Sequence, residues 1–176
     1  MFKRGLVALS GDPIHNGHID LVRESKTRAK EVLVAVANND EKKNSYLFSL
    51  KERTDFARRA LNGMEGVKVV NSPTEILSDT YLHFGCDALF RGIRDDKDQA
   101  YEETQMGYHK MIYPKLNPVY LSFRGRNTIS SSAVKAFVQH HIDVAQHVPI
   151  FVKRALEEKI SFQYKIGVTG GIAVGK

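Results

Sequence analysis

The sequence has no tryptophan, a single cysteine and five prolines in 176 residues. One thiol cannot form an internal disulfide, so a disulfide-stapled secreted scaffold is excluded and a reducing compartment is indicated. No apolar run approaches the roughly 20 residues that a membrane span needs. The N-terminal MFKRGLVALSGD has too short an apolar stretch for a signal peptide and indicates a first strand. We therefore predict a cytoplasmic protein with no membrane segment.

Long blocks of like charge are also missing. The net charge is +6, which could suit a nucleic acid. Basic residues are nevertheless interleaved with acidic ones, as in KERTDFARR and RALEEK. The positive excess suits an anionic small molecule at least as well, and we predict no nucleic-acid partner.

Apolar runs alternate with helical stretches along most of the chain. Strands are predicted at 5–10, 31–37, 67–71, 88–92 and 119–123. Helices are predicted at 18–29, 50–61, 75–84, about 99–113, from 130 to about 141, and at 150–160. Ser49 and Glu52 have the spacing of a capping box for the second helix, and Pro149 suits the first turn of the last. The pattern predicts an α/β protein with a Rossmann-like, doubly wound, five-stranded parallel sheet and C-terminal helices.

The turn after the first strand, SGDPIHNGH at residues 10–18, is the first candidate site. In an open parallel sheet, ligands bind beyond the carboxyl ends of the strands. Gly17 would let a ligand approach the backbone, and His18 falls in the first turn of a helix, where N–H groups favour phosphate. Residue types alone leave three interpretations open: a polar surface loop, a metal site made of Asp12, His15 and His18, or the HxGH signature of nucleotidyltransferases.

Residues 12–20 resemble the opening of bacterial phosphopantetheine adenylyltransferase, a family of the HxGH superfamily. Further matches follow in family order at 34–39, 42–43, 48–50, 52–53, 91–94, 101–102 and 129–132, so the resemblance covers about residues 3–159. It implies an enzyme that transfers AMP from ATP to 4′-phosphopantetheine, giving dephospho-coenzyme A and pyrophosphate. The expected mechanism is direct in-line attack assisted by Mg²⁺. Bacterial relatives form hexamers, which implies a homo-oligomer.

The resemblance also implies site residues. Catalytic roles fall on His18, which would stabilise the transition state, on Lys42 and on Arg91. The implied ATP-binding residues are Ser10, Gly11, His15, His18, Gly92, Ile93, Arg94, Glu102, Arg126, Asn127, Thr128, Ile129, Ser130, Ser131 and Ser132. The implied acceptor-binding residues are Ser10, Lys42, Leu77 and Arg91. No protein ligand to a metal is implied.

The sequence departs from the family pattern at three places. Ser10 and Gly11 replace a Thr-Phe pair, His15 replaces the usual Thr, and Arg126-Asn127 stands where an aromatic residue is usual before Ile129. These changes leave the reaction type better defined than the acceptor. The alternatives are transfer to another small phosphorylated substrate such as nicotinate mononucleotide, a cytidylyltransferase, or a non-catalytic nucleotide-binding domain.

The end of the chain carries a second motif. Residues 162–168 indicate a new strand, and 170–176 read GGIAVGK, the phosphate-loop pattern GxxxxGK without its Ser or Thr. Residues 169–172 resemble the opening of dephospho-coenzyme A kinase, which uses the product of the implied reaction. We therefore expect an adenylyltransferase domain at 1–160 and the start of a fused kinase domain at 161–176.

Overall fold

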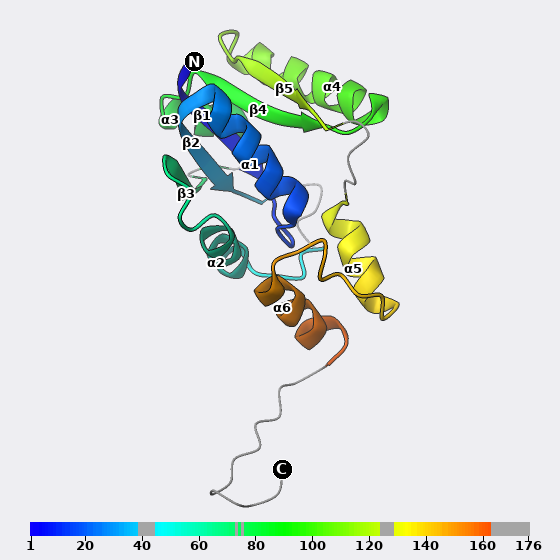
Figure 1. Ribbon diagram of the computed structural model, residues 1–176. Helices are drawn as coiled ribbons and strands as arrows, with labels where there is room; N and C mark the ends of the chain where they lie inside the picture. The colour runs from blue at the N-terminus through cyan, green and yellow to red at the C-terminus, as the bar shows by residue number, and fades with distance from the viewer. Residues whose placement is uncertain (39–44, 73, 75, 124–128, 163–176) are drawn as a thin grey trace, which may run out of the picture.

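The computed structural model describes residues 1–38, 45–72, 74, 76–123 and 129–162. Its centre is a five-stranded sheet in the order β3-β2-β1-β4-β5, in which all neighbouring strands pair in parallel (Figure 1). The strands are β1 Phe2–Leu9, β2 Ala29–Val36, β3 Val67–Asn71, β4 Ala88–Ile93 and β5 Pro118–Ser122. The predicted five-stranded parallel α/β fold is confirmed.

Six helices complete the described part of the chain. They are α1 Asn16–Arg28, α2 Leu50–Ala60, α3 Leu77–His83, α4 Asp96–Ile112, α5 Ser131–Gln139 and α6 Ile150–Ile160. The capping box predicted at Ser49 and Glu52 is present. Helix α4 begins three residues before its predicted start because the Asp95 side chain accepts the N–H of Asp98 at 2.8 Å and caps it. None of the described helices is both long enough and apolar enough to cross a membrane.

Two apolar cores cover the two faces of the sheet. Successive strand residues point to opposite faces, so Val7 packs in the core that includes Phe56 of α2, whereas Leu6 packs with Tyr81 of α3 and Met106 of α4. Burial on both faces explains why the central strands are almost continuously apolar. Cys86 lies in the second core, where burial raises the pKa of its thiol to about 11. It is therefore a packing residue.

The order of strands reverses at β1, which lies between β2 and β4. Helices α5 and α6 lie beyond the carboxyl ends of the strands, on the side away from the N-terminus (Figure 1). The Ser131 hydroxyl donates to the carbonyl of Pro13 at 2.9 Å, and the Asn16 N–H donates to the carbonyl of His147 at 2.8 Å. These bonds attach the C-terminal helices to the turn after β1, where such folds bind ligands.

The expected domain boundary and kinase-like start stay predictions, because residues 163–176 lie outside the described residues.

Arg53 of α2 ties the ends of two strands together from inside the protein. Its side chain is 1% exposed. The guanidinium donates to the carbonyl of Ser10 at 2.6 Å, of Ala37 at 3.0 Å and of Phe48 at 3.2 Å. Ser10 follows β1 and Ala37 follows β2, so one side chain fixes the spacing of both strand ends.

We expect Arg53→Met to lower the free energy of unfolding by about 3 kcal/mol, because one buried and two part-buried carbonyl acceptors lose a charged donor. Urea unfolding would measure the change. The control is Arg58→Met on the same helix, which removes an exposed arginine paired with Asp55 at 3.4 Å and should change stability by less than about 0.5 kcal/mol. Equal effects of the two variants would contradict the role of Arg53.

Candidate active site

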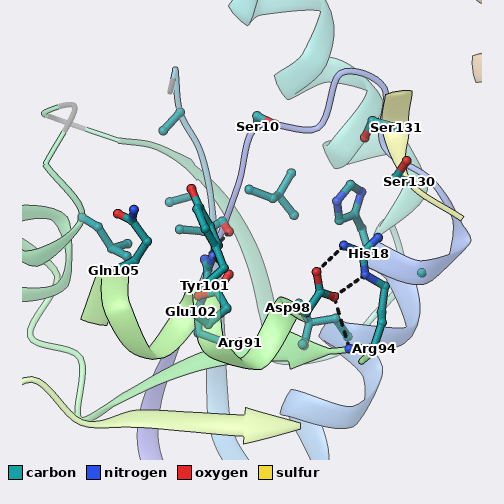
Figure 2. A pocket seen from close by; sticks show the side chains of 18 of the residues that line it. Ser10, His18, Arg91, Arg94, Asp98, Tyr101, Glu102, Gln105, Ser130 and Ser131 are labelled. Carbon is teal, nitrogen blue, oxygen red and sulfur yellow. Dashed lines mark hydrogen bonds and ion pairs between the residues drawn. The ribbon is translucent and has the colours of Figure 1, made fainter. Parts of the chain in front are cut away.

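A cavity of about 820 Å³ opens at the carboxyl ends of the strands, beside the reversal of strand order (Figure 2). Its walls come from the ends of β1, β2 and β4, from the first turn of α1, from α3, from one face of α4 and from the start of α5. This volume lies within the size range of ligand pockets.

The first turn of α1 supplies two stacked histidines. His15 is the residue before the helix, and its ring stacks on that of His18 with centroids 3.7 Å apart and planes at 23°. The His15 N–H donates to Nδ1 of His18 at 3.3 Å. Since Nδ1 accepts, the neutral His18 ring carries its proton on Nε2. A side chain at Gly17 would begin 3.1 Å from two atoms of the His15 ring, which explains the glycine between the histidines.

His15 is uncharged at neutral pH. It is 6% exposed, and its Nδ1 has no hydrogen-bond partner among the described residues. Burial, followed by the charges of Arg94 and His147, lowers the pKa of His15 to about 4. His15 therefore supports the His18 ring as a neutral aromatic surface.

Carboxylates of helix α4 bind the two arginines at the end of β4, Arg91 and Arg94. Glu102 accepts from Nε and Nη2 of Arg91 at 2.7 and 2.5 Å, and Nη1 of Arg91 donates to the carbonyl of Ala8 at 3.2 Å. Asp98 accepts from Nε and Nη2 of Arg94 at 2.5 and 2.7 Å. The side-chain hydrogen bond raises the pKa of Arg94 and lowers that of Asp98. Both guanidinium groups are thus oriented by carboxylates one turn apart on the same helix.

The serines at the start of α5 form the opposite wall. Ser130 accepts the N–H of Ala133 at 3.1 Å and caps the helix, and Ser131 donates to Pro13 as described above. Figure 2 shows His18 between these serines and the Arg94–Asp98 pair, with Arg91, Tyr101 and Glu102 further along the cavity. A helix N-terminus beside basic groups favours anionic ligands.

Asp12 does not face this cavity. Its carboxylate is 4% exposed and accepts from Lys135 Nζ at 2.7 Å and from the N–H groups of Leu47 and Phe48 at 3.0 and 2.9 Å. The interpretation of Asp12, His15 and His18 as a metal site therefore loses its carboxylate. Among the described residues no group of three or more His, Cys, Asp or Glu is arranged to hold a metal.

Most of the predicted site residues meet in one place. Those that line the cavity are Ser10, His15, His18, Leu77, Arg91, Gly92, Arg94, Glu102, Ile129, Ser130, Ser131 and Ser132. Two others do not line it: Ile93 is 4% exposed in the core, and Gly11 is a buried turn residue with φ +58°. Lys42, Arg126, Asn127 and Thr128 lie outside the described residues.

The sequence reasoning missed one face of α4. Asp98, Gln105, Met106 and His109 line the cavity together with Glu102. Their spacing of three and four residues is that of one helix face, so the period around Glu102 was the available signal. Burial, together with the charge of Arg91, lowers the pKa of His109.

Comparisons with known proteins bear on the family and the fold. The family model described as cytidylyltransferase-like matches residues 11–137. A phosphopantetheine adenylyltransferase from Lactobacillus helveticus is 33% identical over 156 residues, covering 88% of this chain and 94% of the relative. One from Lactobacillus johnsonii is 37% identical over 152 residues, covering 86% and 90%. A solved structure from Vibrio parahaemolyticus, described as a nicotinate-nucleotide adenylyltransferase, has a TM-score of 0.60 at 13% identity over 89% of this chain and 99% of that one, which supports the fold alone.

Because the pKa of His15 falls from 6.5 to about 4 on folding, the unfolded chain binds a proton there between those values and the folded chain does not. Stability from this group is complete above pH 6.5 and declines toward pH 4, by about 3 kcal/mol in all. We expect His15→Thr to remove this part of the slope in urea unfolding free energies measured from pH 4 to 7. An identical slope in both proteins would contradict the low pKa of His15.

Proposed function

The chain belongs to the phosphopantetheine adenylyltransferase family, and from this we propose that the cavity brings ATP and 4′-phosphopantetheine together for direct transfer of AMP. The protein is an adenylyltransferase of coenzyme A biosynthesis. The observation that carries the assignment to this cavity is the backbone-anchored His18, which lies between the Arg94–Asp98 pair and the serines at the start of α5.

Direct transfer requires positioning and charge stabilisation, with no protein nucleophile. The acceptor phosphate attacks the α-phosphorus of ATP, and pyrophosphate leaves from the opposite side. Negative charge grows on the oxygens around the α-phosphorus as the reaction proceeds. His18, with its proton on Nε2 and its Nδ1 held by the His15 N–H, donates a hydrogen bond to that charge. Because its orientation is already fixed, little reorganisation accompanies the step.

The two arginines bind different phosphate groups of the substrates. Glu102 and the Ala8 carbonyl take three of the five N–H groups of Arg91, so the guanidinium is held in one plane while its other N–H groups can contact the acceptor phosphate. Arg94 and the start of α5, at Ser130–Ser132, bind the phosphates of ATP. Leu77 lies on the acceptor side. Lys42 and residues 126–128 remain predicted phosphate contacts.

Magnesium needs few protein ligands in this arrangement. The two carboxylates among the described lining residues, Asp98 and Glu102, are each bound by an arginine. Mg²⁺ keeps several waters and readily binds through substrate phosphates. The described residues do not fit a protein-built magnesium cage, so we propose that the ion enters with ATP and assign it no further step.

We also propose that the protein is a homo-oligomer. Three large apolar side chains lie exposed near the end of α4: Tyr108, Met111 and Ile112 are 60%, 81% and 61% exposed. Exposed apolar groups of this kind mark surfaces that another protein chain covers. Light scattering should give a mass above the 19.8 kDa of one chain, and Met111→Lys should reduce it. A wild-type mass of one chain would contradict the proposal.

The activity is tested with the purified chain, ATP, Mg²⁺ and 4′-phosphopantetheine. We expect pyrophosphate release together with dephospho-coenzyme A, detected by mass spectrometry. Nicotinate mononucleotide as acceptor, and CTP as donor, should give little or no release. No release with any pair would exclude the enzymatic function, and release only with nicotinate mononucleotide would change the acceptor.

In the same assay His18→Ala should lower kcat by about 10²- to 10³-fold, as expected for a lost donor to transition-state charge. The dissociation constant of ATP should change little, because the role is confined to the transition state. His83→Ala, which removes an exposed histidine at the end of α3, serves as the control and should retain kcat. An unchanged kcat in His18→Ala would remove His18 from the mechanism.

A further inference from the structure

Behind the cavity, one ion pair joins two segments that are 123 residues apart in the chain. Lys135 of α5 donates to Oδ2 of Asp12 at 2.7 Å. The Asp12 side chain is 5% exposed and that of Lys135 is 24% exposed. Neither residue lines the cavity, so any influence of the pair on the reaction must pass through other residues.

The pair lies between the two walls that hold the phosphate chemistry. Asp12 precedes His15 by three residues, in the turn that ends at His18. Lys135 lies one turn into the helix whose first residues, including Ser131, line the opposite wall. The second polar bond across this gap is that of Ser131 to the carbonyl of Pro13 at 2.9 Å. Two bonds from α5 therefore end on adjacent residues of the turn.

Asp12 itself cannot shift easily. Its two oxygens also accept the N–H groups of Leu47 and Phe48 at 3.0 and 2.9 Å, so the carboxylate is fixed to the segment before α2. The ammonium group of Lys135 thus bonds to an anchored acceptor, and the bond sets the position of α5 relative to the turn.

We propose that Lys135 is a positioning residue, which through its bond to Asp12 sets the distance between the α5 serines and His18. Without the ammonium group, α5 keeps the Ser131 bond to this turn and leaves a buried carboxylate without its cation. The serines then move relative to His18, and small displacements of groups around a reacting phosphate lower the rate strongly. The proposal rests on the proposed adenylyl transfer, whose residues it positions.

The test uses three variants of the full chain. Lys135→Met keeps the aliphatic stem and removes the charge, and Lys135→Arg keeps the charge. Lys153→Met on α6 is the matched control, because Lys153 is 21% exposed and also bonds to carboxylates, but these belong to Asp143 and Glu157 and not to the turn after β1. At saturating ATP and 4′-phosphopantetheine, we expect Lys135→Met to lower kcat by about 10- to 100-fold. Lys135→Arg should recover most of the rate, and Lys153→Met should keep it.

Hydrogen exchange over residues 129–134 provides a second readout on the same proteins. It should be faster in Lys135→Met than in wild type, and unchanged in Lys153→Met. A Lys135→Met protein that is less stable but has the wild-type kcat would overturn the proposal, because the pair would then be structural only. Absence of turnover in the wild type would instead overturn the proposed function. In that case hydrogen exchange still tests the positioning role, and an unchanged exchange rate in Lys135→Met would overturn it.

Discussion

Parallel strands end in backbone carbonyls that no neighbouring strand satisfies, and a ligand site built there needs those ends held without blocking them. In this protein the guanidinium of Arg53 performs that task from inside, by donating to carbonyls after β1 and after β2 and to Phe48 before α2. Because Arg53 is 1% exposed, its geometry does not depend on solvent. The Ser10 side chain stays on the cavity wall while its carbonyl is held from behind. The turn to His18 therefore begins from a fixed point.

Around that fixed end, the charges that face the cavity are arranged by pairing. Glu102 and Asp98, one turn apart on α4, each bind an arginine at the end of β4. Partnered guanidinium groups keep their direction, and unlike flexible lysines they need little reordering when an anion binds. His15 works in the opposite way, because burial keeps it neutral and so it adds no charge beside His18. In the proposed reaction, the arginines, the helix ends and the predicted contact Lys42 would supply positive potential at the phosphates, and His18 would supply a directed hydrogen bond.

The fold was largely predictable from the sequence because the buried parallel strands are continuous apolar runs that alternate with helical stretches. Most of the described site residues predicted from the resemblance do meet in one cavity. Which charged side chains pair with one another was not predictable from the sequence. Nothing in the residue order indicates that Glu102 binds Arg91, or that Asp12 turns away from the cavity toward Lys135. Such pairs depend on how distant segments pack. Gln105 and His109 are a different case, because their helical spacing from Glu102 was already present in the sequence.

The exchange of a Thr-Phe pair for Ser10 and Gly11 becomes understandable in the same terms. Gly11 has φ +58°, a conformation in which a phenylalanine would be strained. A side chain there would also begin 2.8 Å from Cδ1 of Leu9. Leu9 itself lines the cavity, whereas Gly11 does not. The apolar wall next to the turn is therefore provided by residue 9, and the hydroxyl of Ser10 keeps its place beside it. Such a change alters the shape of the pocket without moving a charged group, so its effect should fall on the fit of the bound molecules while the phosphate chemistry is preserved.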